Sequence, residues 1–196
     1  MSTPKNKILI DIGHARGTGA NGTDVEGVTY NEHEVCELLA IDLALALKKQ
    51  GIDSVIIDYA EYTNSQDLNK TINTANELTK SESTDYDFGV SLHMDASDNT
   101  DAHGGHVCYY MYSDTKGKYL AKAVADQLVV ILPGRANATV GRLDLAVLKD
   151  TIKPWILIEN GFITNQADLN TMITSFTRAE VADALAVGIK NALKYL

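Results

Sequence analysis

Residues 8–14 read Ile-Leu-Ile-Asp-Ile-Gly-His, a short apolar run that passes directly into an imidazole. Residues 90–93, Val-Ser-Leu-His, end in the same way, and residues 156–159, Ile-Leu-Ile-Glu, end on a carboxylate. Short apolar runs are typical of strands buried on both faces of a parallel sheet. If these three strands are parallel neighbours, their carboxyl ends meet at one sheet edge, where ligands bind in such folds. We therefore expect His14, His93 and Glu159 to converge there.

The rest of the chain alternates similar runs with amphipathic segments. Strands are predicted at 7–10, 54–57, 88–92, 107–110 and 155–158, and helices at 32–50, 66–80, 116–131 and 178–196. The apolar residues that share helical spacing in the first helix are Val35, Leu38, Leu39, Ile41, Leu45 and Leu47. This alternation predicts an α/β fold of the phosphorylase/hydrolase-like kind. We expect a single layered domain with a mostly parallel or mixed twisted sheet of about six strands flanked by helices.

The composition is that of one ordinary folded domain. The 196 residues are 45% hydrophobic and 22% charged, which predicts a single domain over 1–196. Seventeen Lys and Arg against 26 Asp and Glu give a net charge of −9, the wrong sign for binding nucleic acid phosphates or anionic lipid. Cys36 and Cys108 have no closely spaced partner, so we expect buried thiols. No apolar run is long enough for a membrane span or a signal-peptide core, so we expect cytoplasmic synthesis without an export signal and no membrane insertion.

The three converging side chains point to a metal site. Taken singly, a histidine at a strand end is more often a hydrogen-bonded loop residue, and a carboxylate there often caps a helix. Taken together, two imidazoles with one or two carboxylates are the donor set that Zn²⁺ accepts in catalytic sites, where one position stays open. The Gly-rich segment 13–28 is predicted to be a loop lying over this site, and 99–105 a second loop of the same kind.

Glu32 and Glu34 are both candidates for the third metal ligand. Asn31 followed three residues later by Glu34 fits a capping box, in which the Glu34 side chain bonds back to the Asn31 backbone N–H. Glu32, at the first helical position, has no local role beyond a favourable interaction with the helix dipole. The local pattern favours Glu32, and both glutamates remain candidates on that pattern.

Several segments, taken in order along nearly the whole chain, carry a likeness to a known family. They are Asp11-Ile12-Gly13-His14, the segment 27–35, Asn73-Thr74-Ala75-Asn76, the segment 91–96, the segment 105–110, Leu145-Ala146-Val147-Leu148 and the closing segment 156–165. Together they resemble the zinc-dependent N-acetylmuramoyl-L-alanine amidases of the amidase-3 family, which include bacterial cell-separation amidases and phage endolysins. In the register of that family, the metal-binding glutamate is Glu32 rather than Glu34. Such motifs in order are far more specific than any one of them alone.

The resemblance implies a reaction as well as a fold. It implies one Zn²⁺ per chain held by His14, Glu32 and His93, with Glu159 as the catalytic base. The implied substrate is peptidoglycan, and the implied bond is the amide between N-acetylmuramic acid and the L-alanine of the stem peptide. The protein would then act on the bacterial cell wall. We expect a monomer without a separate wall-binding domain, and a phage endolysin rather than a secreted autolysin.

Other polar residues near these motifs have less specific roles. His106, Asp95 and Arg142 are candidates for contact with substrate, and His106 is also a candidate for a fourth ligand or an oxyanion donor. Asp11 is expected to orient a neighbouring histidine or a loop amide rather than to bind metal.

The chain departs from the family pattern at three positions. Asp95 stands where the family usually has Asn, Ile12 where it has Pro or Ala, and Lys70 where it has Arg. None of these departures removes a proposed ligand. His33 is expected to be a surface residue of its helix. His103, like His106, is a candidate for a fourth ligand or an oxyanion donor, with a solvated loop residue as the alternative.

Two other functions fit parts of this pattern. A zinc carboxypeptidase or aminopeptidase of related architecture would keep the metal and change the bond, but a dinuclear peptidase needs more ligands than these strand ends offer. A catalytically silent wall-binding module would keep the fold, but it has no need of three metal ligands and Glu159 in one place. The amidase is therefore the function we expect.

Overall fold

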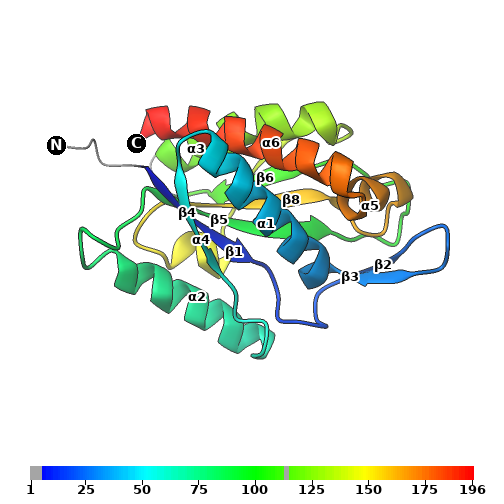
Figure 1. The fold of residues 1–196 in the computed structure, drawn as a ribbon, viewed down its shortest axis with the longest axis horizontal. Coiled ribbons are helices and arrows are strands. Elements are labelled where there is room, and N and C mark those ends of the chain that lie inside the picture. The colour runs from blue at the N-terminus through cyan, green and yellow to red at the C-terminus, as the bar shows by residue number, and fades with distance from the viewer. Residues whose placement is uncertain (1–5, 113–114) are drawn as a thin grey trace.

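A six-stranded mixed sheet forms the centre of the structure, a computed structural model that describes residues 6–112 and 115–196. The strands lie in the order β4-β1-β5-β8-β6-β7, and their bounds are β1 Lys7–Ile12, β4 Asp53–Ile57, β5 Phe88–Asp95, β6 His106–Tyr110, β7 Thr139–Arg142 and β8 Trp155–Phe162. The pairs β1–β4, β1–β5, β5–β8 and β6–β7 are parallel, whereas β6 runs antiparallel to β8. The predicted mixed sheet of about six strands is therefore confirmed (Figure 1).

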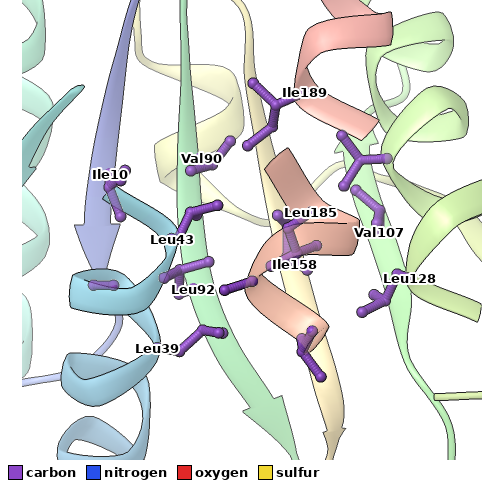
Figure 2. Packing of buried hydrophobic residues seen from close by; sticks show 14 of the residues in the cluster. Ile10, Leu39, Leu43, Val90, Leu92, Val107, Leu128, Ile158, Leu185 and Ile189 are labelled. Atoms are coloured by element: carbon purple, nitrogen blue, oxygen red, sulfur yellow. The ribbon is translucent and has the colours of Figure 1, made fainter. Parts of the chain in front are cut away.

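Helices cover both faces of this sheet. One face carries α1 Glu32–Lys49, α3 Thr115–Ile131 and α6 Ser175–Ala192, and the other carries α2 Asn64–Leu78 and α4 Ala146–Lys149 (Figure 1). The larger core lies under the first three helices, where Ile10, Val90 and Ile158 of the sheet pack against Leu43 and Leu185 (Figure 2). Each fully buried side chain of this size stabilises the fold by about 1.5–3 kcal/mol relative to an exposed one.

The three central strands are buried on both faces along most of their length, as the continuous apolar runs predict. Because β1, β5 and β8 are parallel neighbours, their carboxyl ends lie side by side at one edge of the sheet. Across this edge His93 of β5 pairs with Glu159 of β8, and Glu159 pairs with His106 of β6. Paired residues point to the same face of a sheet, so these three side chains share the face covered by α2 and α4.

Several short elements lie outside the predicted set. The segment 13–28, expected to be one loop, contains β2 Asn21–Thr23, which pairs in antiparallel fashion with β3 Thr29–Asn31 just after the segment. Strand β7, helix α4, helix α5 Gln166–Ile173 and the 3₁₀ turn Leu193–Tyr195 were also not predicted as elements of their own. These elements have three to eight residues, too few to establish a helical or strand period in the sequence.

Helix α1 buries only part of the face that its apolar residues predicted. Leu38, Ile41 and Leu45 are exposed, whereas Cys36, Ala40, Leu43 and Ala46 lie in the core with Val35, Leu39 and Leu47. The helix carries apolar residues around much of its circumference, so spacing alone does not select the buried side. Packing against the sheet and α6 decides it.

Both cysteines are buried free thiols, as expected. Within the described residues, none of the helices combines the length and the apolar character needed to cross a membrane. The first five residues, on which the expected lack of an export signal partly rests, lie outside the described part of the chain.

Candidate metal centre and active site

Glu32 sits at the first position of α1, where the helix meets the carboxyl edge of the sheet. Asn31 caps the helix by accepting a hydrogen bond from the backbone N–H of His33, as its position predicted. Glu34 is exposed, and the described residues contain no hydrogen bond from the backbone N–H of Asn31 to the Glu34 carboxylate, so the full capping box is not formed. The Glu32 side chain instead turns inward and is only 3% exposed.

One carboxylate oxygen of Glu32 lies between two imidazoles. Glu32 Oε1 is 3.2 Å from His14 Nε2 and 3.1 Å from His93 Nδ1. The backbone N–H of Met94 donates to the same oxygen at 3.1 Å, and that of Ala20 donates to Oε2 at 2.9 Å. The three side chains form the single His/Cys/Asp/Glu cluster with metal-binding geometry among the described residues, with donor atoms within 4.8 Å of one another.

The backbone at the end of β1 is shaped to bring His14 into this cluster. His14 adopts a left-handed conformation, φ 64°, which is uncommon for a residue with a side chain and is often found at functional sites. Its carbonyl oxygen accepts a hydrogen bond from His33 Nδ1 at 2.6 Å, which holds the strained turn against α1.

Two glycines leave room for the cluster. A Cβ atom on Gly13 would lie 2.3 Å from Cε1 of His93, and a Cβ atom on Gly19 would lie 2.8 Å from Oε2 of Glu32. At both positions, the Cβ atom of any larger residue would overlap a side chain of the cluster.

This cluster fits a divalent ion of the zinc type. Two ligands about 2.1 Å from a zinc ion at a tetrahedral angle lie about 3.4 Å apart, close to the 3.1 and 3.2 Å seen between Glu32 and the two imidazoles. Two nitrogens and one carboxylate are also the usual three protein ligands of one class of catalytic zinc site.

The same contacts control the protonation of the ligands. Burial alone would raise the pKa of Glu32, but the hydrogen bonds from His14 and His93 hold it well below its usual range. Burial would lower the pKa of His93, but the hydrogen bond to Glu32 and the charges of Glu159 and Glu32 raise it to about 9. A metal ion would take the place of the proton that His93 carries.

Glu159 lies beside the cluster without belonging to it. Its Oε2 is buried and has no hydrogen-bond partner among the described residues. Burial, which outweighs the opposing charge of His93, raises the pKa of Glu159 to about 7. A carboxyl group with this pKa can both take up and release a proton near neutral pH.

A family model described as N-acetylmuramoyl-L-alanine amidase matches residues 8–191 of the chain. The chain belongs to this family. The matched region contains the whole His14, Glu32 and His93 cluster together with Glu159, and the resemblance expected from the motifs is confirmed.

Individual relatives show the same likeness. An uncharacterised cell wall amidase of Bacillus anthracis is 25% identical over 190 residues, which cover 93% of this chain and 34% of that protein, so the chain spans about a third of its length. The solved N-acetylmuramoyl-L-alanine amidase from Clostridium difficile 630 has a TM-score of 0.82 at 24% identity and covers 98% of each chain. The catalytic domain of an endolysin that targets Clostridia difficile has a TM-score of 0.73 at 26% identity, over 95% of this chain and 97% of that domain.

His106 lies on β6, across Glu159 from His93, and it meets Asp95 of β5. His106 is only 4% exposed, and its Nδ1 lies 3.6 Å from Oδ2 of Asp95. Burial and the nearby guanidinium groups of Arg135 and Arg142 lower the pKa of His106 to about 4, so its ring is neutral near pH 7. These positions place both residues beside the proposed base.

Sequence reasoning missed Arg135. One of its guanidinium nitrogens lies 3.5 Å from Oδ2 of Asp95, and the guanidinium stacks over the Phe162 ring at 5.1 Å. It therefore partly offsets the extra charge of Asp95, the residue that departs from the family pattern. Arg135 lies in a loop outside every recognised motif, so the sequence held no signal for this pair.

Arg142 pairs with another side chain of the protein, and Asp11 has partners other than those expected. Arg142 at the end of β7 donates to both carboxylate oxygens of Asp144, at 2.9 and 2.7 Å. Asp11 accepts hydrogen bonds from the hydroxyls of Thr71 at 2.8 Å and Ser91 at 2.5 Å, rather than from a histidine or a loop amide. Asp11 thus ties β1 to α2 and β5.

The two remaining histidines, His103 and His33, differ in how well the structure agrees with their predicted positions. His103 is an exposed loop residue whose Nδ1 donates to the carbonyl of Asp101 at 2.7 Å, as the solvated-loop alternative predicts. The prediction for His33 was wrong. Its side chain is fully buried, and its Nδ1 donates to the carbonyl oxygen of His14.

Proposed function

We propose that this chain hydrolyses the amide bond between N-acetylmuramic acid and the first L-alanine of the peptidoglycan stem peptide. The observation that carries the proposal is the cluster of His14, Glu32 and His93 beside the partnerless oxygen of Glu159. Membership of the amidase family supplies the reaction class and the polymer. We propose that the metal is zinc, one ion per chain.

His14, Glu32 and His93 would hold the ion. When bound, zinc supplies a Lewis acid that polarises the amide carbonyl and makes an attacking water more acidic. The hydrogen bonds from Ala20 and Met94 fix the carboxylate of Glu32, and the left-handed turn at residue 14 fixes one imidazole. This arrangement leaves little reorganisation for the site when the substrate binds.

Glu159 moves the proton. Its carboxylate takes a proton from the water that attacks the carbonyl carbon, and its acid form then donates that proton to the nitrogen of the leaving alanine. A pKa raised to about 7 by burial suits both steps near neutral pH. We propose that the neutral ring of His106, which pairs with Glu159 across β6 and β8, donates a hydrogen bond to the carbonyl oxygen of the substrate.

Several finer expectations remain predictions. They are direct contact of Asp95 and Arg142 with the substrate, action as a monomer, a single domain over residues 1–196, and a role in phage lysis. The likeness to an endolysin catalytic domain supports the last of these. A dinuclear peptidase receives no support, because the described residues contain one metal-binding cluster.

Purified peptidoglycan tests the proposal. The zinc-loaded protein is expected to release new N-terminal alanine without new reducing sugar ends, and a chelator is expected to stop the release. Release of other N-terminal residues would indicate a peptidase, and new reducing ends would indicate a glycosidase. Either result would overturn the proposal.

A further inference from the structure

A cleft of about 280 Å³ adjoins the proposed metal site, and Glu159 is not among the described residues that line it. His14 and His93 form one end of it, and its walls come from α2 and from the segment that leads into α4. A substrate bound with its amide at these histidines therefore has space to extend into the cleft.

The cleft is acidic, and the imidazoles of His14 and His93 are the basic groups among the described residues of its wall. Three aspartates line it, Asp11, Asp67 and Asp144, and no Lys or Arg is among the described residues that do so. Asp144 is already paired with Arg142, and Asp11 accepts two hydroxyl hydrogen bonds. Among the described residues that line the cleft, Asp67 is the carboxylate with a buried oxygen, Oδ1, that has no hydrogen-bond partner.

The side chain of Asp67 is also deeply placed. It is 5% exposed, and its Oδ1 is buried with no hydrogen-bond partner in the described chain. Burial, with the negative charge of Asp11, raises the pKa of its carboxyl to about 6. Buried carboxylates are normally paired with a cation or hydrogen-bonded. The ligand that suits Asp67 is therefore a positively charged group that can donate hydrogen bonds.

The rest of the cleft wall is apolar and suits an aliphatic chain. Leu68, Leu145, Val147 and Leu157 line it beside Asp67. A side chain with several methylene groups and a terminal ammonium matches this combination, because its stem can lie on the apolar wall while its head donates to the carboxylate. A divalent metal ion does not match, because Asp67 belongs to no cluster of three metal-binding residues among those described.

We propose that this cleft is a specificity site for the side-chain ammonium of a diamino acid in the stem peptide, with Asp67 as its counter-ion. The assignment rests on the proposed function, because that function places a stem peptide at the metal site. A primary ammonium can also come from a de-N-acetylated amino sugar, but that group has no methylene stem to occupy the apolar wall.

Defined muropeptides test this assignment. The substrates are N-acetylmuramoyl-L-alanyl-D-isoglutaminyl-L-lysine, the same compound acetylated on the lysine side chain, and a norleucine analogue with a de-N-acetylated sugar. We expect the zinc-loaded parent protein to cleave the lysine compound with a kcat/KM at least tenfold above the other two, mainly through KM. In Asp67→Asn the preference should fall to within twofold, whereas the control Glu77→Gln, an exposed residue on the same helix, should keep it.

Three results would overturn the assignment. They are equal turnover of the lysine and acetyl-lysine compounds by the parent, a preference that survives in Asp67→Asn, and a preference that follows the sugar amine. The comparison of substrates on the parent decides the question even if Asp67→Asn fails to fold.

Binding separates this assignment from the proposed function. Calorimetry with the free peptide L-alanyl-D-isoglutaminyl-L-lysine needs no turnover, and the parent should bind it at least tenfold more tightly than Asp67→Asn does. If no muropeptide is cleaved, the proposed function fails, and equal peptide affinities would then overturn the cleft assignment separately.

Discussion

Replacement of Gly13 by alanine should abolish tight zinc binding although Gly13 itself supplies no ligand. The new Cβ would lie 2.3 Å from Cε1 and 2.4 Å from Nε2 of His93. Carbon atoms in contact normally lie about 3.5–4.0 Å apart, so the ring must move by about 1 Å. Metal–ligand distances tolerate deviations of only about 0.2 Å, so His93 is lost as a ligand.

The expected loss is at least about 100-fold in zinc affinity, which corresponds to about 2.7 kcal/mol. Zinc at about 100 times its dissociation constant stabilises a protein by a similar amount, so Gly13→Ala should also lose most of the zinc-induced rise in melting temperature. Titration calorimetry and thermal unfolding with and without zinc measure both effects. Gly13 has no positive φ, so the backbone itself accepts alanine.

Gly17→Ala is the matched control. Gly17 lies in the same loop with φ +72°, and a Cβ there would meet nothing within 4 Å. This variant should lose about 1–2 kcal/mol of stability from backbone strain and keep the zinc affinity of the parent. If Gly13→Ala bound zinc as tightly as Gly17→Ala, the placement of His93 against the end of β1 would be wrong.

Three further predictions concern protons and charges. Glu159→Gln should bind zinc as tightly as the parent and have a kcat at least about 100-fold lower, because general acid–base catalysis contributes a rate factor of about 10²–10⁴. Turnover at the parent rate in this variant would remove Glu159 from the mechanism. Zinc binding at pH 7.5 should release about one proton, since the pKa of His93 is raised to about 9 and only neutral imidazole binds the metal. Calorimetry in two buffers of different ionisation enthalpy measures the number of protons released. A heat of binding that does not depend on the buffer would contradict the prediction. Asp67→Asn should be more stable than the parent at pH 7.5 by up to about 3 kcal/mol, at 1.36 kcal/mol per pKa unit, since burial raises this carboxyl from 3.8 to about 6. The folded state favours the protonated form of Asp67, so the stability that this form contributes is present below pH 4 and is lost as the pH rises through 6. In urea unfolding, the difference in unfolding free energy between the two proteins should therefore close at pH 4. A difference that stays constant with pH would contradict this cause.

The sequence contained enough to place the main site. Each of the three segments that end in His14, His93 and Glu159 is apolar and long enough to read as a buried strand, and parallel pairing then brings their ends together. The choice of Glu32 over Glu34 was also open to sequence reasoning, because Asn31 as the capping residue makes Glu32 the first residue of the helix.

Other features depend on packing that no local pattern records. Helix α1 carries apolar residues on most of its sides, so only the position of α6 and the sheet decides that Leu38 and Ile41 stay exposed. Arg135 reaches Asp95 from a loop about 40 residues further along the chain. Asp67 reads in the sequence as an ordinary residue of a helix first turn, and its burial in the cleft follows from how α2 lies on the sheet.

The most direct test of the proposed amidase activity is to identify the bond that the protein breaks. N-acetylmuramoyl-L-alanyl-D-isoglutaminyl-L-lysine would be incubated with the zinc-loaded protein in ¹⁸O-labelled water, and the products analysed by mass spectrometry. The account predicts N-acetylmuramic acid with ¹⁸O in its lactyl carboxylate, together with a peptide that begins with unlabelled alanine. Label in the carboxylate of an amino acid of the peptide, or an intact substrate in the presence of bound zinc, would contradict it.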